Sequence, residues 1–138
     1  MKLYIGRSKW WDSCTYPRVG QWPLSAEKET ALLAKYASLL VAAYATYEIW
    51  KQHSYNLDEY FVRVELDSTE LSEKVYVVLG AHPEKITWPG EWAPYRLRID
   101  VYANPAFASA KEAQAFLQEC IAAKPESRFI VVELTVVR

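Results

Sequence analysis

Residues 25–53 of the chain read SAEKETALLAKYASLLVAAYATYEIWKQH, and this stretch decides how the remainder is interpreted. Apolar side chains recur along it at three- and four-residue intervals, from Leu33 to Trp50, which is the period of one face of a helix. Ser25 precedes the first of them and can accept a hydrogen bond from an amide of the first turn. The pattern predicts one long helix that spans the whole stretch.

The middle of this predicted helix, residues 36–47, contains no charged side chain. A helix that is apolar around most of its circumference is normally covered by other elements. A membrane-spanning helix needs roughly 20 apolar residues, and the uncharged run has only 12. We therefore expect a buried core helix and no membrane segment.

Length and charge are typical of a small globular protein. The 138 residues suit a single domain, residues 1–138, that buries about two thirds of its unfolded surface. The net charge of −1 argues against broad electrostatic binding to nucleic acid or to anionic membranes. Cys14 and Cys120 are far apart, and the first residues lack a signal-peptide pattern. We expect free thiols, with Cys120 buried on a helix, and a cytoplasmic location.

Shorter patterns predict strands and a second helix. Ser109 and Glu112 form a capping box for a helix that Lys124 and Pro125 end. Strands are predicted, from alternating or continuous apolar residues, at 2–7, 59–66, 75–79, 95–102 and 128–138. Residues 80–83 (GAHP) are expected to end the third of these strands.

The predicted order is strand, helix, three strands, helix, strand (βαβββαβ). Strands with one apolar face, and two helices to cover it, favour an α+β fold built as a two-layer sandwich. We expect a mixed or antiparallel sheet of about five strands, arranged as a ferredoxin-like variant with one extra strand.

The sequence carries no recognisable catalytic or metal-binding motif. Its histidines, His53 and His82, and its two cysteines do not have the spacing of a zinc site. It contains no serine-nucleophile motif and no glycine-rich phosphate loop. We therefore expect no catalytic residue, no metal and no cofactor.

Tryptophan is concentrated in two predicted loops, residues 8–24 and 86–94. Exposed tryptophans are frequent at the energetic centres of protein interfaces. One interpretation is that these rings contact a partner, and the alternative is that they fold back over the ends of the sandwich. The four residues concerned are Trp10, Trp11, Trp88 and Trp92.

Arg96 and Arg98 alternate with apolar residues in the strand predicted at 95–102 and share its outer face with Asp100. Opposite charges on neighbouring strands stabilise a sheet by about 0.2–1 kcal/mol per pair, so a solvated sheet face is one interpretation. The other is a recognition face for an acidic partner.

Residues 95–138 resemble a strand–helix–strand unit of small phage-encoded accessory proteins. Inhibitors of host defence complexes, the anti-CRISPR proteins among them, resemble this chain in size, acidity and lack of a catalytic motif. The resemblance implies a fold fragment and suggests a bacterial protein as the partner. It is carried by the residues FASAKEA (107–113), AAKP (122–125) and FIVV (129–132).

A second resemblance is carried by two stretches of the chain. They are Leu3, Tyr4, Ile5 and Gly6, and then 20–25 (GQWPLS) with Ala31, Tyr36 and Ala37. These stretches resemble the first strand, and the next strand and helix, of ADP-ribosyltransferase-like enzymes. The resemblance implies an NAD-using transferase with Arg7 and Glu133 in its site. Ile5 departs from the pattern, because an NAD-binding His or Arg is expected at its position.

Three hypotheses of function follow. The first is a cytoplasmic, non-enzymatic protein-binding module, phage-encoded and inhibitory toward a bacterial defence complex. The second is the NAD-using transferase, and the third is a structural homo-oligomer built on the long helix. In the first hypothesis the partner contacts are Trp10, Trp11, Trp88, Trp92, Arg96 and Arg98.

Overall fold

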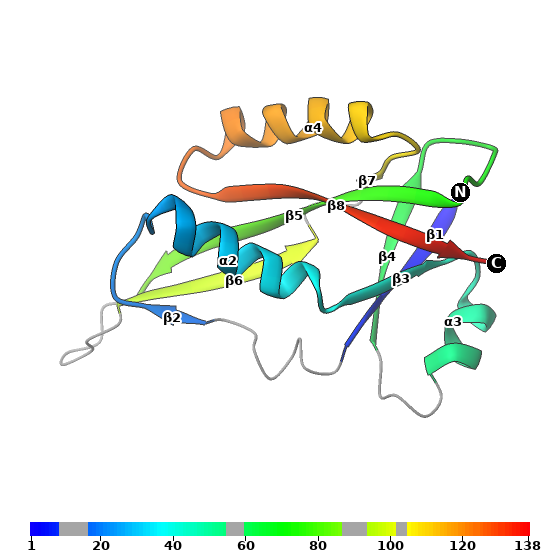
Figure 1. Ribbon diagram of the computed structural model, residues 1–138, viewed down its shortest axis with the longest axis horizontal. Helices are drawn as coiled ribbons and strands as arrows, with labels where there is room; N and C mark the ends of the chain where they lie inside the picture. The colour runs from blue at the N-terminus through cyan, green and yellow to red at the C-terminus, as the bar shows by residue number, and fades with distance from the viewer. Residues whose placement is uncertain (9–16, 55–59, 87–93, 102–104) are drawn as a thin grey trace.

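The structure, a computed structural model, describes residues 1–8, 17–54, 60–86, 94–101 and 105–138. Within these residues, eight strands form one sheet that curls into half a barrel, and three helices pack on it (Figure 1). The elements in chain order are β1 (Lys2–Arg7), β2 (Arg18–Val19), α2 (Ala26–Ala37), β3 (Leu40–Tyr44), α3 (Tyr47–Ser54), β4 (Tyr60–Leu66), β5 (Lys74–Lys85), β6 (Tyr95–Val101), β7 (Pro105–Ala106), α4 (Ala110–Ala123) and β8 (Arg128–Val137).

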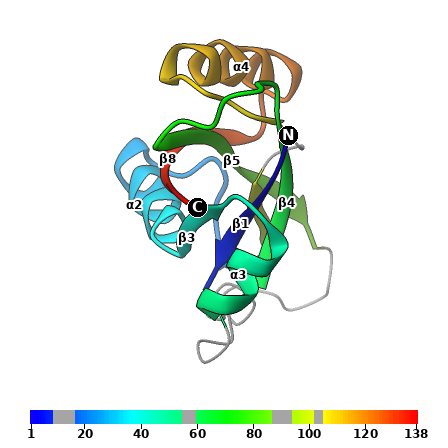
Figure 2. The ribbon, with the colours of Figure 1, turned by 90° about the vertical axis from the view of Figure 1, so that its right-hand side faces the viewer.

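The fold is mixed α+β, but the predicted five-stranded, two-helix ferredoxin-like sandwich is wrong. The described strands are arranged in the order β2-β6-β5-β8-β3-β1-β4-β7. Strands β2, β3 and β7 have no counterpart in the predicted order. Neighbouring strands are rotated by roughly 20–25° relative to one another, and over this many strands the sheet curls rather than staying flat (Figure 2).

The segment predicted as one long helix, residues 25–53, contains two helices and a strand. At the end of α2 the Ser38 hydroxyl donates to the Lys35 carbonyl (2.6 Å). At the start of α3 the Thr46 hydroxyl oxygen accepts the Ile49 N–H (3.1 Å). Such side-chain bonds to the backbone favour helix ends over helix interiors. The prediction of a continuous helix is therefore wrong.

Between the two helices, β3 enters the middle of the sheet. It pairs antiparallel with β1 and parallel with β8. Leu40 and Ala43 are buried, whereas Val41 is 50% exposed. Strand formation by such residues depends on the neighbours against which they pack, and here two strands supply backbone partners to an uncharged segment. Tertiary pairing thus overrides the helical period.

One end of the sheet is tied back to its middle. Strand β7 pairs parallel with β4. The next residue, Phe107, exchanges two backbone hydrogen bonds with Tyr76 of β5 (2.8 and 2.9 Å). Because β5 also carries β8 and β6, this bridge fixes the curl seen in Figure 2.

Strand β5 continues through residues 80–83, which were expected to end it, so that prediction is wrong. Beyond Ala81 the strand pairs with β6 but no longer with β8, and proline is tolerated where a strand has an open side. Because Gly80 has no Cβ, it leaves room for the rings of His82 and Phe129. A Cβ on it would lie 2.8 Å from Nε2 of His82 and 3.0 Å from the ring of Phe129.

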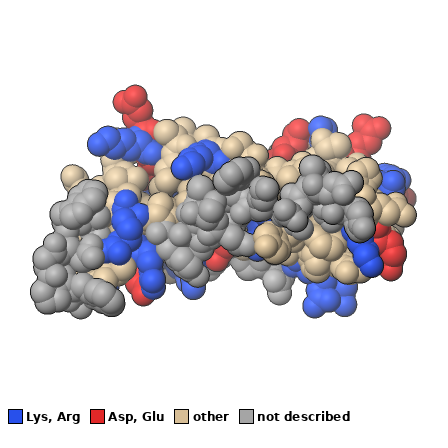
Figure 3. All heavy atoms as spheres, turned by 90° about the horizontal axis from the view of Figure 1, so that it is seen from below, with Lys and Arg blue, Asp and Glu red and all other residues tan. Residues whose placement is uncertain are grey.

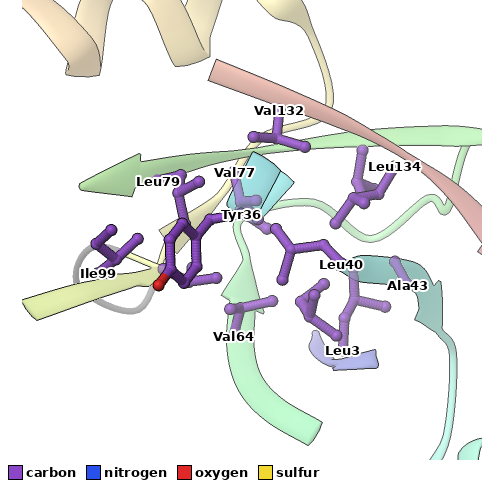
Figure 4. Close-up of a cluster of buried hydrophobic side chains, with 14 of the residues drawn as sticks. Leu3, Tyr36, Leu40, Ala43, Val64, Val77, Leu79, Ile99, Val132 and Leu134 are labelled. Carbon is purple, nitrogen blue, oxygen red and sulfur yellow. The ribbon is translucent and has the colours of Figure 1, made fainter. Parts of the chain in front are cut away.

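The main core fills the concave face of the sheet (Figure 4). Helix α2 contributes Leu33 and Tyr36, and the tyrosine is only 1% exposed. On the opposite face of β5 and β8, α4 packs Cys120 against Val78 and Phe129. The predicted burial of Cys120 is confirmed, and the burial raises the pKa of its thiol.

Helix α3 covers the outer face of β1 and β4 with an aromatic cluster. The Trp50 ring lies 4.6 Å from that of Phe61, and the Tyr4 ring lies 5.3 Å from the same phenylalanine. Tyr47 joins the cluster at 41% exposure. Rings at these separations and angles interact favourably edge to face.

We predict that Tyr36→Ala lowers the free energy of unfolding by about 3–5 kcal/mol, because truncation of a buried aromatic ring leaves a cavity. Tyr60→Ala is the matched control, since Tyr60 is 50% exposed, and should cost no more than about 0.5 kcal/mol. Urea denaturation followed by circular dichroism measures both. Equal losses would contradict the position of α2 in the core.

Candidate functional site

The four tryptophans predicted to contact a partner lie outside the described residues. Trp10 and Trp11 belong to residues 9–16, the first tryptophan segment, and Trp88 and Trp92 belong to residues 87–93, the second tryptophan segment. Both interpretations of their rings therefore stay predictions. The described residues that flank the two segments do have defined positions.

Three of the four flanking residues lie at one edge of the sheet, whereas Ser8, before the first tryptophan segment, donates its N–H to the Leu39 carbonyl (2.9 Å) just before β3. After the first tryptophan segment, the Pro17 carbonyl accepts a hydrogen bond from the Leu97 N–H of β6 (2.9 Å). Around the second tryptophan segment, the Ile86 N–H donates to the Pro94 carbonyl (2.6 Å) at the end of the β5–β6 hairpin. The end of the first tryptophan segment and both ends of the second thus join the described chain beside β6.

Three arginines, Arg18 of β2 and Arg96 and Arg98 of β6, define what we call the arginine edge. Arg18 lies opposite Arg96 in register, and Nη2 of Arg96 donates to both carboxylate oxygens of Glu84 (2.8 Å each). Nε of Arg98 lies 3.6 Å from Oδ2 of Asp100, and the Arg98 side chain is 54% exposed. Arg98 and Asp100 both belong to β6, so this ion pair lies within one strand.

A polar cluster centred on the buried residues His82 and Ser127 lies beside this edge. Nδ1 of His82 is 2.9 Å from the Ser127 hydroxyl oxygen, and Nε2 is 3.7 Å from an Asp100 carboxylate oxygen. Together with Arg98, His82 lines a small cavity of about 220 Å³. Sequence reasoning missed the cluster, because β5, β6 and the turn before β8 bring together residues that are far apart in the chain.

The chemistry of the cluster follows from its burial. Burial, followed by the nearby Arg98 and Lys124, lowers the pKa of His82 to about 4, and burial raises the pKa of Asp100. A neutral His82 can accept the Ser127 O–H at Nδ1 and direct its Nε2–H toward Asp100. These are the residue types of a hydrolase triad, with the ring nitrogens exchanged. Ser127 is only 4% exposed, so the arrangement favours a structural role over attack on a substrate.

An open groove of about 820 Å³ lies between α2 and the chain that follows β2. Val19, Leu24 and Leu32 supply apolar lining, and Lys28 and Lys35 of α2 supply positive charge. The sequence pattern did not indicate this groove, because β2 contains only two residues and lies inside a predicted loop.

One wall of the groove is held by Trp22. Its indole Nε1 donates to the Glu126 carbonyl (2.8 Å), and the Arg128 guanidinium lies 5.8 Å from the centre of its ring. Nε of Arg128 also donates to Glu29 of α2 (2.9 Å). The chain after β2 and the first turn of α2 are therefore fixed to the turn that precedes β8.

The residues named for the transferase hypothesis lie on different strands, with β3 between them. Glu133 of β8 accepts a hydrogen bond from the Tyr76 hydroxyl (3.2 Å) and lies 3.7 Å from Nζ of Lys74. Arg7 ends β1 and contributes to the charge near Asp100.

Among the described residues, no three His, Cys, Asp or Glu side chains gather as metal ligands could. None of the described helices has the length and apolar character needed to cross a membrane.

Comparison of the chain with protein-family models, with curated proteins and with solved structures found no match.

We predict that the free energy of unfolding falls as the pH is lowered from about 6.5 toward 4. In this window the unfolded state binds a proton at His82, whereas the folded state, with a pKa of about 4, does not. His82→Asn keeps an acceptor for Ser127 but cannot titrate, so its stability should depend less on pH.

Urea denaturation at pH 7, 6 and 5 measures this slope. The raised pKa of Asp100 has the opposite effect, because protonation of this carboxylate in more acidic solution favours the folded state. The comparison is therefore made at pH 5 and above. Parallel pH profiles for wild type and His82→Asn would contradict the assignment.

Proposed function

We propose that this chain is a non-enzymatic protein-binding module whose partner contacts the arginine edge and the two tryptophan segments. One observation carries the proposal: the residue after the first tryptophan segment and the residues on both sides of the second are hydrogen-bonded at β6 or at the end of the β5–β6 hairpin. Pro17 directly precedes Arg18, and Pro94 lies two residues before Arg96. The two tryptophan segments, with their four tryptophans, therefore each have at least one end beside the three residues of the arginine edge.

The chemistry of these residues supports binding. Trp and Arg are enriched among the residues that dominate interface energies, because each supplies a large contact area with directional polar groups. The pairing of Arg96 with Glu84 holds its guanidinium in place and reduces the entropy lost when a partner binds. Arg98 remains half exposed beside it.

The partner that fits this edge is a protein with an acidic surface. Guanidinium groups bind carboxylates with strong, geometrically specific hydrogen bonds. Residues 95–138 resemble a unit of small phage-encoded accessory proteins, some of which inhibit host defence complexes, and we therefore propose a bacterial defence complex as the source of that surface. In that role the chain would act by occupying a site on the complex, without chemistry of its own.

We predict that immobilised wild-type chain captures a bacterial protein and that Trp88→Ala/Trp92→Ala and Arg96→Ala/Arg98→Ala each lose it. Loss of interface anchors worth about 2 kcal/mol weakens binding roughly 30-fold. Arg63→Ala is the matched control, because Arg63 is exposed on β4, away from this edge. Captured proteins are identified by mass spectrometry and their affinities measured by calorimetry.

Each variant is first compared with wild type by circular dichroism and thermal denaturation. Capture of the same protein by wild type, by both double variants and by Arg63→Ala would contradict the assignment of the edge. Absence of any captured protein from lysates of several bacteria and their phages would contradict the binding function itself.

A further inference from the structure

The groove between β2 and α2 presents two lysines that no acidic side chain neutralises within the described residues. Lys28 and Lys35 line it together and lie seven positions apart on α2, which corresponds to about 10 Å along the helix. Glu29, the acidic residue between them in sequence, is bound to Arg128 instead. The groove is therefore basic although the whole chain has a net charge of −1.

Apolar side chains lie between the lysines. Ala31 and Leu32 occupy the intervening turn of α2, and Val19 and Leu24 face them from the other wall. Leu32 and Val19 also pack against the main core, so this lining is fixed. The groove thus combines an apolar floor with positive charge about two helical turns apart.

We propose that this groove binds an acidic amphipathic segment of the partner protein, one that places apolar side chains on the floor and carboxylates against Lys28 and Lys35. The proposal rests on the protein-binding function above and specifies which part of the partner this groove receives. It adds a second contact surface to the arginine edge.

The position of β2 connects the two surfaces. Arg18 belongs to the arginine edge, whereas the next residue, Val19, lines the groove. Successive side chains of a strand point to opposite faces, so a partner that crosses β2 meets both. Figure 3 shows the underside of the molecule, on which Lys and Arg side chains lie both at the end that holds β2 and at the opposite end.

An acidic protein segment matches the groove better than a nucleic acid does. A phosphate backbone is bound through many cations and with little apolar contact, whereas the floor here is apolar. An amphipathic helix presents acidic residues seven apart with leucines between them, in the same spacing as the lysines. Such a helix would match the groove in both charge and apolar surface.

The test uses a defined probe, a fluorescein-labelled amphipathic peptide of about 15 residues with glutamates seven positions apart around leucines. A second peptide replaces the glutamates by glutamines. Binding to full-length protein is followed by fluorescence anisotropy at low and high salt, and by amide NMR shifts at peptide concentrations up to about 1 mM.

Lys28→Glu/Lys35→Glu should weaken binding of the glutamate peptide about tenfold or more, because each reversal replaces attraction by repulsion. The matched control is Lys2→Glu/Lys111→Glu, which changes the net charge equally on β1 and α4. It should change the affinity less than about twofold, because charges beyond about 8 Å are screened at physiological salt. The largest NMR shifts should fall within residues 19–35.

Three results would overturn the proposal: equal weakening by both double variants, no NMR shift at residues 19–35, or tighter binding of a single-stranded oligonucleotide than of the glutamate peptide. If the captured partner still binds Lys28→Glu/Lys35→Glu with wild-type affinity, this inference fails and the protein-binding function stands. If wild type captures no protein, the broader proposal fails.

Discussion

The pairing of residues 40–44 with two strands at once is the constraint on which the remaining structure depends. As β3, this segment is hydrogen-bonded to β1 on one side and to β8 on the other. It thereby joins the arm that contains β1, β4 and β7 to the arm that contains β8, β5, β6 and β2. A continuous helix in its place would leave the two arms without a shared strand.

The same constraint determines where the proposed binding groove lies. Because the chain leaves α2 to enter the sheet, α2 is short and lies within the curl, where Tyr36 and Leu33 fill the core and Lys28 and Lys35 remain at the surface. The ion pair between Glu29 and Arg128 then sets the start of α2 against the turn before β8. The groove is a consequence of this placement, whereas the arginine edge is set by the pairing of β2, β6 and β5.

Local signals allowed much of the chain to be predicted. The caps are confirmed, since Ser25 accepts the Lys28 N–H (3.3 Å) and Ser109 the Glu112 N–H (3.2 Å). The prediction failed where contacts with residues distant in sequence determine the local structure. Residues 40–43 fit a helix as well as a strand, and only their pairing with β1 and β8 selects the strand. The cluster of His82 with Ser127 has the same origin, since no local spacing relates residues brought together by sheet pairing.

Backbone NMR of residues 36–47 tests the central claim most directly. The account predicts extended chemical shifts for residues 40–44, cross-strand contacts between Ala43 and Ile5 and between Ala43 and Val136, which are register partners, and slow amide exchange. Helical chemical shifts through residues 36–47, with contacts three residues apart and none to β1 or β8, would contradict the account and remove the basis for the placement of α2.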